Sequence, residues 1–317
     1  MYQDLGNGIT CIDTGFVRDN LAACYLMVED GEVAIIESGT NSTVPRIRQL
    51  VAEKALLSEQ VKYIIPTHVH LDHAGGVGRL MEVFPKATLV VHPRGARHMI
   101  DPAKLIAGAK VVYGEKRFNT LYGDIIGVPE ERVLVAEDGD SVFLAGRKLE
   151  IRHTPGHAEH HFCVWDENSR GWFSGDNFGI SYQEMEGPED RYVIATSTPV
   201  QFDPNKYLRS LDTLMSYQPA RIYLTHFGML EGAEIVKLAN TLRKGVEEYH
   251  SIGLRLKDAE NREKAIREAI TEYEVFGLRQ ALPFMTKEQA LELLSDDILL
   301  NAQGINVWLE RMNRNSS

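Results

Sequence analysis

The sequence has few cysteines and no long hydrophobic run, and each shortage excludes a class of protein. Its three cysteines, Cys11, Cys24 and Cys163, form no Cys-X-X-Cys pair, so we expect buried, reduced thiols rather than a disulfide framework. No stretch reaches the ~20 apolar residues that span a bilayer, and residues 1–7 carry no basic and apolar signal segment. The sequence therefore predicts a cytoplasmic protein without a membrane partner.

Positive charge is scarce relative to negative charge. The 317 residues include 34 Lys and Arg against 45 Asp and Glu, which gives a formal net charge of -11. Nucleic-acid binding needs clustered basic side chains that neutralise phosphates, so this balance argues against a nucleic-acid partner. The chain also lacks the Gly-X-Ser-X-Gly of serine hydrolases and the Gly-Lys-Ser/Thr of phosphate-binding loops. We expect a small-molecule substrate and a reaction without a serine nucleophile.

One segment, by contrast, is dense in metal-binding residue types. His68, His70, Asp72 and His73 lie within six positions, directly after the apolar, strand-like segment 61–65. Histidines two residues apart in an extended chain can point to the same side and share one ion, while the turn that follows faces the same space. Imidazole and carboxylate suit zinc, iron or manganese. The segment therefore predicts a transition-metal site.

Three other strand-like segments also end in a candidate ligand. The pairs are 148–154 with His157, 171–174 with Asp176, and 221–225 with His226. Each candidate lies just beyond the carboxyl end of its strand, where open α/β sheets place their ligands. Four strand ends are therefore expected to converge on one site.

Together these motifs resemble the metallo-beta-lactamase superfamily of metal-dependent hydrolases, over about residues 8 to 230. The matching pieces are Thr67 to His73, Thr154-Pro155-Gly156-His157, Ser174-Gly175-Asp176 and Leu224-Thr225-His226. The resemblance implies two divalent transition-metal ions, most simply zinc, with iron or manganese as alternatives. It implies that His68, His70 and His157 hold the first ion, that Asp72, His73 and His226 hold the second, and that Asp176 bridges them.

Some histidines and one glutamate depart from this pattern. Glu37 stands where the family usually has an aspartate that orients a ligand histidine, and its extra methylene leaves its partner open. His161 is interpreted as a supporting or core histidine, whereas His160 is left unassigned, and neither is counted as a ligand. The remaining histidines are interpreted as ordinary packed or solvated residues, with His92 as the candidate exception because it ends a strand beside the site; they are His92, His98, His153 and His250.

The order of elements predicts the fold. Strand-like segments at 9–13, 22–28 and 33–37 come first, and helices and strands then alternate as far as residue 225. Two strand-then-helix halves imply an αβ/βα four-layer sandwich, with two sheets inside and helices outside. We predict a catalytic domain at residues 1–230 and a helical C-terminal region at residues 231–317.

The C-terminal region has helical spacing of its apolar residues in three segments, 231–249, 256–273 and 286–312, and Thr286-Lys287-Glu288-Gln289 forms a capping box. The apolar residues of the last segment lie on more than one face of the predicted helix, whereas packing on a single neighbour needs only one apolar face. Three roles stay open: packing on the sheet domain, a lid over the pocket, or a homodimer contact. Two further insertions, residues 93–124 and 182–204, contain aromatic residues that either line a pocket or simply pack.

The chemistry predicted for the site is hydrolysis. A hydroxide that bridges the metals would attack an ester, thioester, lactone or amide carbonyl, and Asp72 would orient it and pass its proton to the leaving group. The resemblance points to hydroxyacylglutathione hydrolases and lactonases.

The alternative is an iron-dependent redox enzyme, such as a persulfide dioxygenase-like or diiron oxygen-binding protein, because these ligand types do not separate iron from zinc. A flavin-dependent diiron reductase is disfavoured, since His70 stands where those proteins typically carry glutamate and the chain has no flavodoxin-like part.

Overall fold

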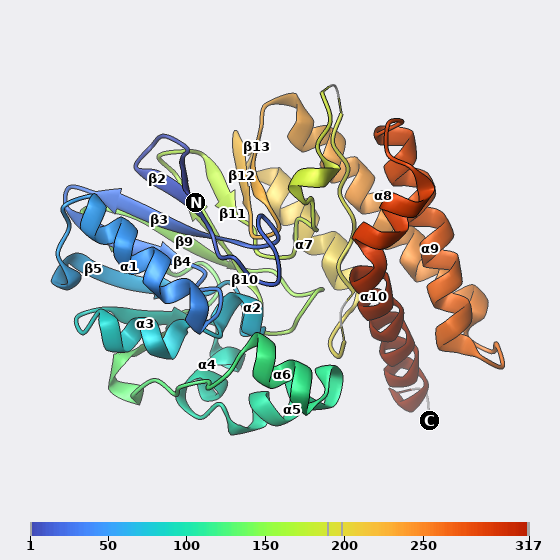
Figure 1. Ribbon diagram of the computed structural model, residues 1–317, viewed down its shortest axis with the longest axis horizontal. Coiled ribbons are helices and arrows are strands. Elements are labelled where there is room, and N and C mark those ends of the chain that lie inside the picture. Colours follow the sequence, from blue (N-terminus) through green and yellow to red (C-terminus); the bar gives the residue numbers. More distant parts are fainter. Residues whose placement is uncertain (1, 189, 198, 316–317) are drawn as a thin grey trace. The chain divides into compact units, whose positions relative to one another are not determined.

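The computed structural model describes residues 2–188, 190–197 and 199–315 (Figure 1). The chain forms two compact units, each assembled from separate segments. Unit 1 runs up to His153 and adds His160–Gly175 and Ala220–Leu230, while unit 2 contains Thr154–Glu159, Asp176–Pro219 and the chain from Glu231 onward. The predicted limit at residue 230 coincides with one of these borders, but unit 2 also takes in two earlier segments. The functional division into 1–230 and 231–317 stays a prediction.

Two sheets supply the strands (Figure 1). The first has the order β1 to β7, with β1 Tyr2–Asp4, β2 Ile9–Asp13, β3 Ala23–Glu29, β4 Glu32–Ile36, β5 Val61–Ile65, β6 Thr88–Val91 and β7 Val133–Val135. The second has the order β13 to β8, with β8 Ser141–Leu144, β9 Arg147–His153, β10 Phe162–Asp166, β11 Gly171–Phe173, β12 Arg221–Leu224 and β13 Gly228–Glu231. Neighbours from β4 to β7 run parallel, as do β11 and β12.

The inner strands of the first sheet, such as β3, are buried on both faces. Because successive side chains of a strand point to opposite faces, Leu26 of β3 joins a core with helices α1 (Val44–Glu53) and α3 (Val77–Val83). Its neighbour Tyr25 joins a second core with Phe162 of the other sheet. The two sheets of unit 1 therefore face each other, with helices outside the first.

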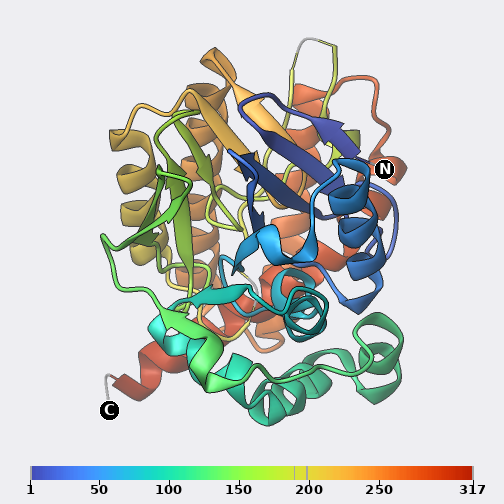
Figure 2. The same ribbon diagram turned by 90° about the vertical axis from the view of Figure 1, so that its left-hand side faces the viewer.

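The insertion predicted at residues 93–124 is helical and belongs to unit 1, shown in teal and green in Figure 2. It consists of α4 Pro93–Ile100, α5 Ala103–Tyr113 and α6 Glu115–Leu121. Phe118 and Tyr122 are buried in a small apolar cluster with Phe16 and with Leu71, the residue before Asp72. Both aromatic rings therefore pack.

The remaining helices of unit 1 are short, and those of unit 2 are long. They are α2 Leu71–Ala74, α7 Pro204–Ser216, α8 Ala233–Leu256, α9 Arg262–Ala281, α10 Lys287–Asn315 and the 3-10 turns η1 Asn41–Thr43, η2 Ser58–Gln60, η3 Glu130–Arg132 and η4 Gln183–Met185.

The predicted capping box opens α10: Gln289 N donates to Thr286 Oγ1 at 3.2 Å, and Thr286 N donates to Gln289 Oε1 at 2.8 Å. None of the described helices combines the length and the apolar stretch that crossing a bilayer requires.

The apolar side chains of α10 are mostly covered within the chain. Ile298, Ile305, Trp308 and Leu309 are buried, and Met312 is 40% exposed. Fewer apolar side chains of α10 are therefore exposed than the sequence indicates. Packing on the sheet domain stays a prediction, and so do a lid and a homodimer contact.

The cysteines agree with their prediction as thiols. Cys11, Cys24 and Cys163 are buried, and none of them forms a disulfide. Burial raises the pKa of the Cys11 thiol to about 12, so this group stays protonated at neutral pH.

A buried carboxyl group joins the C-terminal helices. Glu274 of α9 is 1% exposed and accepts hydrogen bonds from Tyr249 OH at 2.7 Å and Tyr192 OH at 2.9 Å. Burial raises its pKa from 4.5 to about 7, and the charge of Asp297 adds to the rise, although the two tyrosine hydrogen bonds oppose it. Folding therefore favours the neutral carboxyl group.

This shift predicts a pH-dependent stability. The contribution of the neutral Glu274 carboxyl group to the free energy of unfolding is fully present below pH 4.5 and is lost as the pH rises through about 7. The reason is that the unfolded chain releases this proton from about pH 4.5 upward, whereas the folded chain keeps it until about pH 7. At ~1.4 kcal/mol for each pKa unit the loss is on the order of 3 kcal/mol.

Glu274→Gln, which is neutral at every pH, should therefore gain stability relative to the wild type as the pH rises. Thermal unfolding from acid to mildly alkaline pH measures the difference, with Glu272→Gln on the exposed face of α9 as control. Parallel pH profiles of the wild type and Glu274→Gln would contradict it.

Candidate metal centre

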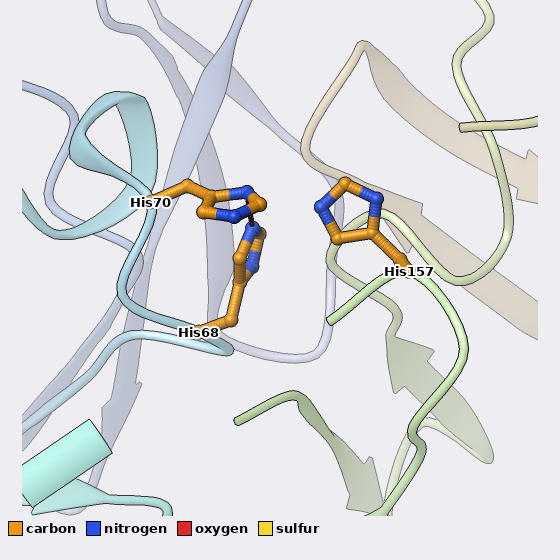
Figure 3. Close-up of side chains that lie close together, drawn as sticks. All are labelled: His68, His70 and His157. Carbon is orange, nitrogen blue, oxygen red and sulfur yellow. Dashed lines mark hydrogen bonds between the residues drawn. The ribbon is translucent and has the colours of Figure 1, made fainter. Parts of the chain in front are cut away.

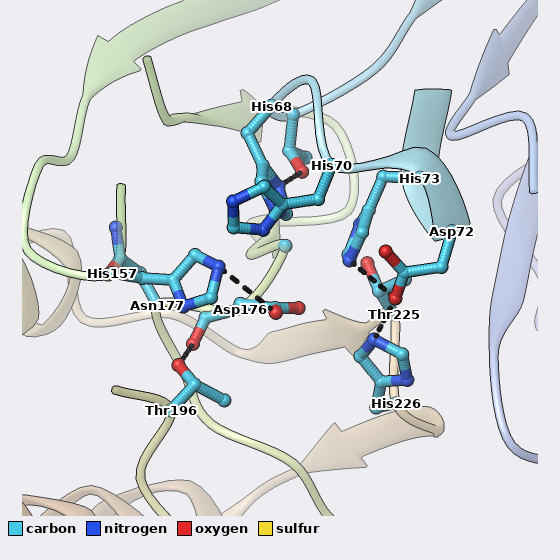
Figure 4. A network of polar contacts seen from close by, with 12 residues as sticks. His68, His70, Asp72, His73, His157, Asp176, Asn177, Thr196, Thr225 and His226 are labelled. Carbon is cyan, nitrogen blue, oxygen red and sulfur yellow. Dashed lines mark hydrogen bonds and ion pairs between the residues drawn. The ribbon is translucent and has the colours of Figure 1, made fainter. Parts of the chain in front are cut away.

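Three donor groups of unit 1 converge where β5 and β12 end (Figure 4). Asp72 Oδ2 lies 3.6 Å from His73 Nε2 and 3.5 Å from His226 Nε2. The three donor atoms all lie within 4.8 Å of one another. Both histidines are buried, whereas the Asp72 side chain is 21% exposed. Two imidazoles and a carboxylate at this spacing fit the donor chemistry of a transition-metal ion.

The other ring nitrogen of each histidine is anchored. His73 Nδ1 lies 3.0 Å from Glu37 Oε1, and His226 Nδ1 lies 2.8 Å from the carbonyl oxygen of Leu21. A carboxylate or carbonyl oxygen only accepts, so each Nδ1 carries a hydrogen, and Nε2, on the side of Asp72, is the ring atom that could bind a metal. Metal-binding histidines in proteins are typically held in this way.

Glu37 connects three parts of unit 1. The ligand histidine that it contacts, left open by the sequence, is His73. Besides His73, its carboxylate accepts from Thr67 N at 3.1 Å, from Thr67 Oγ1 at 2.5 Å and from Thr225 Oγ1 at 3.0 Å. It is 1% exposed and has a left-handed backbone with φ of 63°. Neither threonine was predicted from the sequence to support the site. The signal for them is that each directly precedes a candidate ligand, His68 or His226.

His68 and His70 face each other as their spacing predicts (Figure 3). His68 Nε2 lies 2.9 Å from His70 Nδ1, and His68 Nδ1 lies 3.1 Å from Thr67 Oγ1. His161 is fully buried, with its ring centroid 4.9 Å from that of His68. His160, unassigned from the sequence, stacks on His68 at 6.1 Å, and its Nδ1 accepts from Val69 N at 3.5 Å. Both histidines support the His68 ring.

The two candidate ligands of unit 2 also lie together (Figure 4). His157 Nε2 is 3.4 Å from Asp176 Oδ2. The loop that carries His157 depends on Gly156, because a Cβ there would lie 2.3 Å from the Cα of Tyr207 and its φ is +143°. Asn177 donates to the carbonyl oxygen of Thr154 and ties the two ligand loops to each other.

All seven predicted ligands therefore belong to one of two groups. They are His68, His70, Asp72, His73 and His226 in unit 1, and His157 and Asp176 in unit 2. Their assignment to one dinuclear centre stays a prediction.

The other histidines lie in or beside regular helices and strands. His92 Nδ1 accepts from Arg94 N at 3.0 Å and so caps α4, and its ring lies 4.1 Å from that of His153. Burial lowers the pKa of His92 to about 3, with a further contribution from His153. His98 lies in α4 and His250 lies in α8.

Residues 17–226 match the family model described as the metallo-beta-lactamase superfamily. The chain belongs to this superfamily. Its αβ/βα sandwich with a helical C-terminal segment, predicted from the sequence, is thereby confirmed as the metallo-beta-lactamase fold. The superfamily includes hydrolases as well as diiron proteins, and its fold binds divalent metals. The hydroxyacylglutathione hydrolase or lactonase subtype stays a prediction.

Two relatives illustrate the range of this superfamily. The metallo-beta-lactamase fold-containing protein ST1585 of Sulfurisphaera tokodaii is 26% identical over 228 residues, which cover 70% of this chain and 79% of that protein. An atrochrysone carboxyl ACP thioesterase of Pseudocercospora fijiensis is 22% identical over 269 residues, which cover 84% of this chain and 64% of that protein.

Solved structures of the superfamily share the fold. The metallo-beta-lactamase family protein TTHA1429 from Thermus thermophilus has a TM-score of 0.61 and 21% identity, with coverage of 92% of this chain and 95% of that one. The chemotaxis sensor ODP, solved as a peroxy diiron species, has a TM-score of 0.55 and 15% identity, with coverage of 77% and 93%.

Proposed function

We propose that this metallo-beta-lactamase superfamily protein is a dinuclear metal-dependent hydrolase that cleaves an ester, thioester, lactone or amide carbonyl bond. One observation carries the proposal: Asp72 Oδ2 faces the Nε2 atoms of His73 and His226, and both rings are anchored through Nδ1. This arrangement places the partly exposed carboxylate of Asp72 beside two histidine rings whose hydrogen bonds already hold them in an orientation suited to metal binding. The thioesterase among the relatives supports esters and thioesters as the first substrates to try.

The proposed ligand sets follow the family resemblance. His68, His70 and His157 would hold one ion, Asp72, His73 and His226 would hold the second, and Asp176 would serve as a ligand to both. When bound, such ions act as Lewis acids and lower the pKa of water. The donor sets contain only imidazole and carboxylate, which suits zinc and also iron or manganese.

Asp72 is the residue proposed to move the proton. Its side chain is 21% exposed, so solvent water reaches it, while its Oδ2 is held towards two histidines. Asp72 orients the attacking water and accepts its proton as the water oxygen bonds to the carbonyl carbon. The same proton then passes to the leaving group as the bond to that group breaks. A small-molecule substrate is sufficient for this chemistry.

The second candidate function is an iron-dependent redox reaction, because the fold neighbour ODP was solved with a peroxy diiron species. Iron in the purified protein, together with oxygen consumption on a persulfide substrate, would favour it. Zinc and turnover in an ester, thioester and lactone panel would favour hydrolysis.

The dinuclear proposal predicts the metal content. Elemental analysis of metal-replete protein should give about two transition-metal ions per chain, and Asp176→Asn should lower this number because both ions lose a ligand. Asp212→Asn, a 63% exposed carboxylate of α7 in the same unit, should leave it unchanged. A content that stays at one ion, with Asp72 and His226 replaceable without loss, would contradict the two-metal site.

A further inference from the structure

The side chain of Asn301 binds the backbone on both sides of Thr196. Asn301 Nδ2 donates to the carbonyl oxygen of Ala195 at 3.0 Å, and Asn301 Oδ1 accepts from Ser197 N at 2.6 Å. Ser197 Oγ also donates to the carbonyl oxygen of Asn301 at 3.0 Å. Asn301 lies on α10 and is 2% exposed. A buried amide that satisfies backbone groups of another segment fixes that segment in place.

Thr196 in turn holds Asp176 (Figure 4). Thr196 Oγ1 donates to the carbonyl oxygen of Asp176 at 3.0 Å, and Tyr207 OH donates to the same oxygen at 2.7 Å. Thr196 is 1% exposed and Tyr207 is fully buried, so water does not compete for these bonds. The carbonyl oxygen of Asp176, on the backbone from which its carboxylate projects, is therefore held by two hydrogen bonds.

The same contacts extend to the other C-terminal helices. Asn301 Nδ2 donates also to Tyr249 OH at 3.2 Å, and Tyr249 OH donates to Glu274 Oε1 at 2.7 Å. These residues come from α10, α8 and α9, and all are buried. Hydrogen bonds and the backbone of residues 195–197 thus connect three C-terminal helices to Asp176, all within unit 2.

We propose that Asn301 is a positioning residue for Asp176, and that the C-terminal helices hold this carboxylate in the orientation that metal binding requires. The inference rests on the proposed function only in taking Asp176 as a metal ligand. It gives the helical region a role that needs neither a lid nor a second copy of the chain. Groups that hold metal ligands in place usually contribute strongly to affinity, because a displaced ligand loses its bond geometry.

Two variants test the path at different points. Thr196→Val keeps the shape of the side chain and removes the hydroxyl group, whereas Asn301→Ala removes the amide. Both should weaken zinc binding about 10- to 100-fold, measured by competition with a chromophoric chelator. Thr196→Ser keeps the hydroxyl group and should keep the affinity. The control on the same helix is Asn306→Ala, whose side chain binds Arg262 and Glu310 instead.

A second measurement separates positioning from ordinary packing. A residue that only packs lowers the Tm of metal-free and zinc-loaded protein by the same amount. A positioning residue also reduces the rise in Tm that zinc causes, because the rise depends on affinity. Thr196→Val and Asn301→Ala should therefore show a smaller zinc-induced rise than Asn306→Ala. If Asn301→Ala does not fold, Thr196→Val alone decides.

Asp176→Asn distinguishes the two ways in which the inference can fail. If Asp176→Asn weakens zinc binding while Thr196→Val and a folded Asn301→Ala bind as the wild type does, positioning is overturned and the proposed function stands. If Asp176→Asn itself binds zinc as the wild type does, Asp176 is no ligand, and the proposed ligand set and this inference both fail.

Discussion

Replacing Asp72 with asparagine should lower turnover on an ester or thioester substrate by about 10²-fold or more, because a positioned group that transfers protons contributes at least this much. Asparagine has nearly the same shape but does not accept a proton at neutral pH. The side chain is 21% exposed, so the change should leave the fold intact. Steady-state kinetics and circular dichroism measure the two effects.

The metal content of Asp72→Asn must be measured in the same preparation, because Asp72 is also a proposed ligand beside His73 and His226. A loss of turnover at full metal content assigns the proton transfer to Asp72. Asp124→Asn, an exposed carboxylate in the same unit, is the control and should keep wild-type turnover. Wild-type turnover in Asp72→Asn would reject Asp72 as the proton carrier.

Replacing Glu37 with glutamine should weaken metal binding about 10- to 100-fold. The Glu37 carboxylate accepts from Thr67 N, from the hydroxyl groups of Thr67 and Thr225, and from His73 Nδ1. A glutamine amide turns one of these acceptor positions into a donor, so at least one buried group loses its partner and the His73 ring loses its fixed orientation. Chelator competition measures the affinity.

Glu37→Asp separates the charge of this side chain from its length. Aspartate is the residue that the family usually carries here, and it tolerates the left-handed backbone at this position. It should recover part of the affinity that Glu37→Gln loses. Glu59→Gln, an exposed change in the same unit, controls for the loss of one negative charge. Wild-type metal affinity in Glu37→Gln would show that the carboxylate does not support the site.

Local patterns in the sequence were sufficient for most of the fold. Strands 9–13 and 61–65 have the predicted limits, because alternating or continuous apolar residues and nearby turn residues define a strand within a few positions. Two strands, β1 (Tyr2–Asp4) and β13 (Gly228–Glu231), were not predicted from the sequence. Both are short, partly exposed edge strands, and their pairing depends on a neighbouring strand rather than on a pattern of their own.

Local spacing also determined much of the candidate site. His68 and His70 face each other because residues two apart in an extended chain share a side. Each candidate ligand follows a strand end, so its place along the sheet edge is set within a few residues of chain. The resemblance to the superfamily depends on these same short motifs, which is why the family could be recognised before the structure.

Only the tertiary structure decided which distant groups support those ligands. Glu37 meets Thr225, 188 residues away, and Asn301 meets Ser197, 104 residues away. Such bonds have no period in the sequence, because they form only when separately folded segments are brought together. The same holds for α10: its sequence shows apolar residues, but burial of Trp308 and Ile305 depends on what covers them. The sequence by itself therefore determined the ligand types and their strand-end positions, while tertiary packing determined the partners that hold them.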